Sequence, residues 1–195
     1  MSDVAAVKGA RQQRHLSTLA MAGIAAAASC TLALAAWSIL TTDTYAWILG
    51  GLVALAGIPV AMVDVQTHKL PNRYVAPIAA VGLIQAAAIA FASTDLMRLI
   101  VPMTCGVVVF SAYAAMGMAG WFGFGDAKFA SALTITVAIG SGYASVFVVA
   151  VAVLIGSVQR VLRVVVGHQN PVQAHGPALI TAALIILVAT LTTTR

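Results

Sequence analysis

Two aspartates lie in stretches that are otherwise almost entirely apolar, and each has neighbours suited to catalysis. Asp126 belongs to the octapeptide WFGFGDAK at residues 121–128, and Asp64 directly follows a long apolar run. A bilayer protein rarely keeps such a carboxylate for packing alone. Two adjacent carboxylates can share one proton, so that the ionised group activates water while the protonated group polarises a carbonyl. This pair therefore predicts hydrolysis without a metal, a cofactor, or a cysteine or serine nucleophile.

Each of these residues also has a purely structural interpretation. Asp64 could be a helix-end residue in a polar loop, and Asp126 could be the N-cap of the next helix, where aspartate is favoured. Gly123 and Gly125 could form a tight turn or a close helix contact, or they could leave room for a substrate backbone. Lys128 is expected to extend towards the membrane surface rather than to act directly in catalysis.

The composition of the chain indicates the setting in which these residues act. The 195 residues are 62% hydrophobic and only 8% charged, and the mean hydropathy is +1.03. A helix needs roughly 20 apolar residues to cross a bilayer, and several runs of about that length recur with short polar breaks between them. The fold class is therefore an all-α, polytopic membrane helix bundle.

Seven transmembrane helices are predicted from the apolar runs. They cover residues 16–40, 45–63, 74–92, 99–119, 127–139, 143–158 (with a possible extension to 166) and 177–191. The fifth and sixth are separated at Gly140-Ser141-Gly142, because a single helix from 127 to 158 would be too long for one crossing. The fifth span is short, so Asp126 is expected to lie below the membrane surface.

The basic residues predict the orientation of this bundle. With the N-terminus in the cytoplasm, eight of the ten Lys and Arg residues fall inside, and Arg98 and Arg195 fall outside. The inside set is Lys8, Arg11, Arg14, Lys69, Arg73, Lys128, Arg160 and Arg163. Fusing the fifth and sixth spans would weaken this bias. Two spans separate Asp64 from Asp126, so both aspartates share one membrane face.

The remaining acidic and sulfur-bearing residues are given ordinary roles. Asp43 and Asp95 lie in short external turns and are expected to be solvated, and Asp3 belongs to the N-terminal tail. Cys30 and Cys105 lie inside apolar runs without partners at metal-ligand spacing, and we expect both to be small core residues. The basic charge is a topology signal, so no nucleic-acid partner is expected.

Two motifs together resemble the paired signature of type IV prepilin peptidases and archaeal preflagellin peptidases, which are membrane aspartyl proteases with a GxGD motif. The first motif is Asp64 followed by Leu70, Pro71 and Asn72. The second is Gly123, Gly125, Asp126 and Lys128 within GFGDAK. Ala174-His175-Gly176-Pro177 is similar to a late Phe-Gly-Pro segment of the bacterial enzymes, with His175 in place of the phenylalanine.

The resemblance implies a function and a division of the chain. Asp64 and Asp126 would be the catalytic pair of an endopeptidase that removes the basic leader from prepilin or pseudopilin precursors of Flp/Tad type. The site would face the cytoplasm from a multi-pass position in the inner membrane. A cytoplasmic tail (1–15) and an additional span with its turn (16–44) would precede the peptidase domain (45–195), which would contain six helices.

Some members of this family carry a four-cysteine zinc domain and also methylate the new N-terminus. This chain has two cysteines and no such insertion, so methyltransferase activity is not expected. Two other interpretations of the same residues stay open. The aspartates could relay protons in a small transporter, or the chain could be an inactive subunit of a secretion or pilus apparatus.

Overall fold

The computed structural model describes residues 42–67, 70, 72–166 and 174–193, which are helical apart from short connections. The helices are α2 (Thr42–Thr67), α3 (Asn72–Ser93), α4 (Met97–Met118), α5 (Phe124–Ser141), the 3₁₀ helix η2 (Gly142–Phe147), α6 (Val148–Val165) and α7 (Gly176–Thr193). No strand occurs within the described ranges. The predicted all-α class is therefore confirmed, and the predicted span at 16–40 lies outside the described residues.

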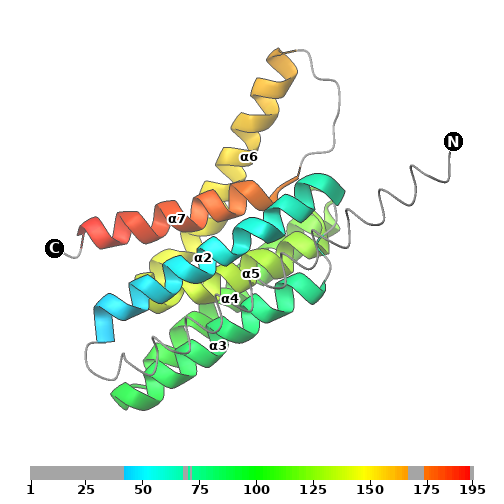
Figure 1. The fold of residues 1–195 in the computed structure, drawn as a ribbon. Helices are drawn as coiled ribbons and strands as arrows, with labels where there is room; N and C mark the ends of the chain where they lie inside the picture. Colours follow the sequence, from blue (N-terminus) through cyan, green and yellow to red (C-terminus); the bar gives the residue numbers. More distant parts are fainter. Residues whose placement is uncertain (1–41, 68–69, 71, 167–173, 194–195) are drawn as a thin grey trace, which may run out of the picture.

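The central element of the bundle is α5, which packs against α2, α3, α4 and α7 (Figure 1). Its side chains Phe129, Leu133 and Val137 are fully buried. Small residues allow its neighbours to approach closely, as expected where lipid supplies no hydrophobic drive between helices. A Cβ added to Gly106 of α4 would lie 2.4 Å from Cγ1 of Ile135, and one added to Gly82 of α3 would lie 2.7 Å from Oγ1 of Thr136.

Among the described residues, three helical stretches are long and apolar enough to cross a membrane. They are Asn72–Ser93, Met97–Met118 and the continuous stretch Phe124–Leu162, while Gly50–Gln66 and Gly176–Thr190 are shorter apolar helices. Large apolar side chains such as Phe91, Phe147 and Leu154 are exposed on the outside of the bundle, as lipid-facing residues would be.

The division predicted at Gly140-Ser141-Gly142 coincides with the end of α5 at Ser141 and the start of η2. The backbone leaves α-helical geometry at Gly142, whose φ of 56° and ψ of −136° a glycine adopts readily. Beyond this point, α6 packs against α7, and the far end of α6 projects away from the bundle (Figure 1). The count of seven spans and the cytoplasmic N-terminus stay predictions.

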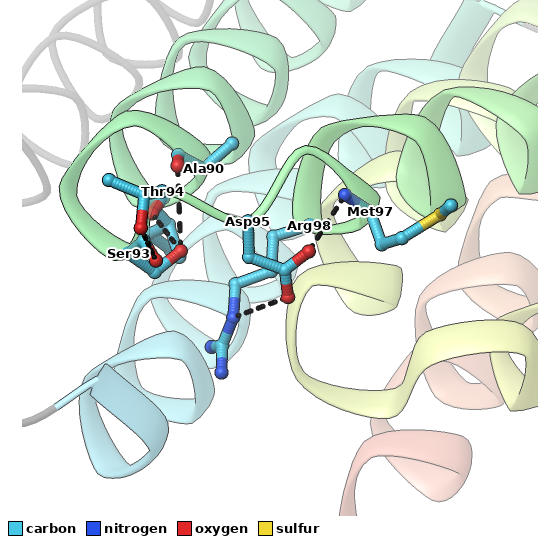
Figure 2. A network of polar contacts seen from close by, with 7 residues as sticks. Ala90, Ser93, Thr94, Asp95, Met97 and Arg98 are labelled. Carbon is cyan, nitrogen blue, oxygen red and sulfur yellow. Dashed lines mark hydrogen bonds and ion pairs between the residues drawn. The ribbon is translucent and has the colours of Figure 1, made fainter.

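The turn between α3 and α4 lies at one end of the bundle and contains Asp95. Its carboxylate accepts the N–H of Met97 at 3.0 Å through Oδ1 and lies 3.6 Å from Nε of Arg98 through Oδ2 (Figure 2). The side chain is exposed, as the sequence predicts. Asp95 thus caps the first turn of α4, where a carboxylate stabilises unpaired N–H groups. Asp43 belongs to α2, but its side chain lies outside the described set.

Candidate active site

Asp64 is a buried residue in the last turns of α2. The apolar run predicts a helix end at Val63, but α2 continues to Thr67, so Asp64 lies inside the helix and not in the polar loop. Its side chain is only 4% exposed. Oδ2 of Asp64 accepts the backbone N–H of Gly176, the first residue of α7, at 2.9 Å. The carboxylate therefore ties the end of α2 to the start of α7.

A glycine at position 176 is required by this contact. A Cβ there would lie 3.1 Å from Cα of Ala61 and 3.1 Å from Oδ2 of Asp64 itself. Only a residue without a side chain lets the backbone of α7 come this close to α2. Gly176 is therefore part of the site through its N–H group, a role that sequence reasoning did not assign.

Asp126 lies in the first turn of α5 and is half-buried. The N-cap of α5 is Gly123, whose backbone is extended, so the alternative that Asp126 is the N-cap is wrong. Asp126 instead occupies the third helical position, and its Oδ2 accepts the backbone N–H of Gly123 at 3.0 Å. Gly123 has no side chain to complete a reciprocal capping box. The carboxylate still gains from the positive end of the helix dipole.

The two sequence motifs meet through two contacts. A Cβ added to Gly125 would lie 3.0 Å from Cβ and 3.3 Å from the carbonyl oxygen of Leu70, so Leu70 rests directly on the start of α5. Nζ of Lys128 donates to Oδ1 of Asn72 at 3.0 Å. These contacts favour the close-contact interpretation of Gly125. Lys128 is exposed, as expected, and it also binds the first motif.

The carboxylates themselves are within electrostatic range of each other, and the charge of Asp64 acts on Asp126. Both lie at the same end of the bundle, where α2 ends and where α5 and α7 begin (Figure 1). A mostly apolar hollow of about 360 Å³ opens between α3, α4 and α5, with the motif residues Asn72 and Lys128, but neither aspartate, on its wall. Pro71, His68 and Lys69 lie outside the described residues, and Gln66 is exposed.

The rings of Tyr113, Phe122 and His175 form a cluster next to the carboxylates. The sequence alone assigned a role to none of the three residues. The hydroxyl of Tyr113 and Nε2 of His175 are 2.8 Å apart, and the ring of Phe122 lies 5.3 Å from the Tyr113 ring and 4.5 Å from the His175 ring between centroids. Burial lowers the pKa of His175 to about 4, so its imidazole is neutral at pH 7. A tyrosine inside the apolar run 99–119 was the available signal for this cluster.

Within the part of the chain that the structure describes, no group of three or more His, Cys, Asp or Glu residues could hold a metal ion. Cys105 is buried, as expected, and its Sγ lies 3.9 Å from the carbonyl oxygen of Gly142. Cys30 lies outside the described residues.

Comparison with protein families identifies the chain. The profile of the type IV leader peptidase family matches residues 51–159, more than half of the sequence. The chain belongs to the type IV leader peptidase family. The matched segment contains both aspartates and both motifs, so the resemblance inferred from the sequence is confirmed. No curated protein and no solved structure matches the chain.

Membership in the type IV leader peptidase family fixes the general activity. The chain is a peptidase of that type, and its apolar helices make it a membrane protein.

Proposed function

We propose that this protein is a membrane-embedded aspartyl endopeptidase that removes the basic leader of pilin-like precursors. The observation that carries the proposal is the meeting of the two motifs: Leu70 rests on Gly125, Asn72 accepts from Lys128, and Asp64 and Asp126 interact electrostatically. Residues far apart in the sequence are thus brought together at the end of the bundle that holds both carboxylates, which supports a shared-proton dyad.

The chemistry follows from the two carboxyl groups. The ionised aspartate accepts a proton from a water molecule, and that water attacks the carbonyl carbon of the scissile peptide bond. The protonated aspartate donates to the carbonyl oxygen as negative charge develops there. The tetrahedral intermediate then collapses with proton transfer to the leaving amine, which gives one new carboxyl end and one new amino end.

The substrate is proposed to be a Flp/Tad-type prepilin or pseudopilin precursor. Such a precursor has a short basic leader followed by a hydrophobic helix, and the cut falls after a glycine or alanine between them. A site at the end of a helix bundle suits a bond at the end of a membrane helix. Lys128 and Arg73 lie near this end of the bundle. The predicted excess of basic residues on the side that holds both aspartates favours a site at the cytoplasmic face of the inner membrane.

The experiment uses the purified full chain in nanodiscs with a synthetic precursor that carries a basic leader, a glycine and an apolar helix. Mass spectrometry of the products should show one cut directly after the glycine and no added methyl group on the new N-terminus. A matched precursor with leucine in place of the glycine should be cut poorly. If the precursor stays intact while proton flux appears in proteoliposomes, the chain is a relay and not a peptidase.

A further inference from the structure

The cluster formed by Tyr113, Phe122 and His175 joins three segments that approach the aspartates from different sides. Tyr113 lies in α4, Phe122 in the connection to α5, and His175 directly before α7. Tyr113 is fully buried, and His175 is 7% exposed. Because each ring contacts the other two, a movement of one segment would disturb the other two.

One side of this cluster leads to Asp64. His175 is the residue before Gly176, whose N–H donates to the Asp64 carboxylate. The imidazole is also confined by α6, since a Cβ added to Gly156 would lie 3.2 Å from both Cε1 and Nδ1 of the ring. The confined His175 ring is therefore one residue away from the amide that donates to Asp64.

The other side of the cluster leads to Asp126. Phe122 precedes Gly123, whose N–H donates to Oδ2 of Asp126. The Asp126 charge also acts on the phenol of Tyr113. The three rings thus contact the backbone segments that supply a donor to each of the two carboxylates.

The Tyr113–His175 hydrogen bond orients the two side chains relative to each other. A neutral imidazole has one donor and one acceptor nitrogen, so the bond at Nε2 couples the tautomer to the phenol rotation: the hydroxyl donates to Nε2 when Nδ1 carries the proton and accepts from Nε2–H in the other tautomer. A phenylalanine at position 175 would fill similar space but would leave the tyrosine hydroxyl without this partner. The pair also adds no net charge beside the carboxylates.

We propose that Tyr113 and His175, packed by Phe122, are positioning residues that fix the separation and orientation of Asp64 and Asp126. The pair acts through the Gly123 and Gly176 amides and does not contact the reacting atoms. This proposal rests on the dyad put forward under Proposed function. It extends that dyad to side chains in α4 and before α7.

The kinetic test compares Tyr113→Phe, His175→Phe and the double variant with the wild-type chain in nanodiscs, using the same synthetic precursor. A displaced carboxylate slows the chemical step more than binding, so each single variant should lower kcat about tenfold with KM within about twofold. The double variant should be no slower than the slower single variant, because each single variant already loses the Tyr113–His175 hydrogen bond. His175→Gln, which can still bond the phenol, should recover most of the rate.

Tyr143→Phe is the control, since Tyr143 is an exposed tyrosine in η2. It should leave kcat unchanged. All rates are expressed per folded molecule, counted from the monodisperse fraction in gel filtration. A wild-type kcat per folded molecule in Tyr113→Phe, or rate losses that multiply in the double variant, would overturn the positioning role.

A second measurement does not depend on cleavage. In the chain labelled with ¹⁵N-histidine, the ring resonances of His175 are identified by their loss in His175→Phe. Replacing Asp126 by Asn should shift them through Tyr113, and Asp64→Asn should shift them through Gly176. Unchanged resonances in both variants would overturn the proposal even where the wild-type chain cleaves the precursor. Shifted resonances in a chain that never cleaves would keep the positioning contact and refute the peptidase dyad.

Discussion

At the scale of single residues, the contact between Gly125 and Leu70 determines how the two motifs meet. An alanine at 125 would place its Cβ 3.0 Å from Cβ of Leu70 and 3.3 Å from its carbonyl oxygen, so the loop or the start of α5 must shift. We predict that Gly125→Ala lowers kcat/KM for precursor cleavage about tenfold or more, as displacements near 1 Å can do. Cleavage rates measured in nanodiscs test this.

Gly51→Ala is the matched control for that substitution. Gly51 lies in α2, and a Cβ there would meet only Cδ2 of Leu187 at 3.8 Å, an ordinary contact. It should keep the wild-type rate. Equal rates for Gly125→Ala and Gly51→Ala would show that the Leu70 contact does not position the site.

His175 makes a prediction about pH and stability. Its pKa is about 4 in the folded chain, lowered by burial, against about 6.5 for an unperturbed histidine. Between these values the unfolded chain binds a proton that the folded chain does not. The free energy of unfolding should therefore fall as pH drops from about 6.5 towards 4, and this loss is absent above that window.

Thermal unfolding in detergent between pH 4.5 and 7.5 measures this effect. In His175→Phe the midpoint should decline less towards acid than in the wild-type chain, because the other histidines are common to both. Parallel declines would contradict a buried, neutral His175.

The aspartates could be identified from the sequence, but their ring partners could not. Asp64 and Asp126 stand out because a carboxylate in an apolar run is rare. Tyr113 is an unremarkable residue within such a run, and it is 62 positions away from His175 along the chain. Their pairing depends on how α4 and α7 are both packed against α5, which helical periodicity does not encode. The N-cap alternative for Asp126 failed because Gly123 can adopt the extended cap geometry without a side chain.

At the scale of helices, the packing of α5 depends on glycines in its neighbours. Gly106 of α4 lies so close to Ile135 that an added Cβ would fall 2.4 Å from Cγ1 and 2.9 Å from Cδ1. We predict that Gly106→Ala destabilises the bundle by about 1–3 kcal/mol, the usual range for overpacking. Reversible unfolding in bicelles measures the change.

The partner residue supplies the control for this prediction. Ile135→Ala removes both clashing atoms, so the double variant Gly106→Ala/Ile135→Ala should be less destabilised than the sum of the two single variants. Simple additivity would mean that the two positions do not contact each other.

The helix ends were predicted to within two residues for α3 and α7 and less well for α2, which continues through polar residues. The predicted span at 74–92 corresponds to α3 at Asn72–Ser93, and the span at 177–191 corresponds to α7 at Gly176–Thr193. For α2 the prediction stopped at Val63, because hydropathy marks the end of an apolar surface and not the end of helical hydrogen bonding. Asp64 consequently belongs to a rigid helix.

At the scale of the whole molecule, the chain must return to the site after α5. Asp126 begins α5 at the site end, and Gly176 begins α7 beside Asp64 at the same end. The segment from η2 through α6 therefore runs back towards that end. This geometry favours two crossings between Phe124 and Leu162 rather than one.

Cysteine labelling tests the two-crossing arrangement. Leu96 and Arg160 are exposed, and Cys105 is buried, so single cysteines at 96 and 160 in a Cys30→Ser background would report on separate ends. Leu96→Cys should react with an impermeant maleimide in intact cells, whereas Arg160→Cys should react only after the inner membrane is opened. Reaction of both in intact cells would mean that the stretch crosses once.

The central claim is that Asp64 and Asp126 act as one catalytic unit, and a double-mutant cycle of cleavage rates tests it most directly. Asp64→Asn and Asp126→Asn should each lower kcat/KM at least about 10³-fold, and the double variant should be no slower than either, because a dyad with one member lost is already inactive. Asp95→Asn, at the α3–α4 turn, should cleave at the wild-type rate. Substantial cleavage by either single variant, or losses that multiply in the double variant, would contradict a shared-proton dyad.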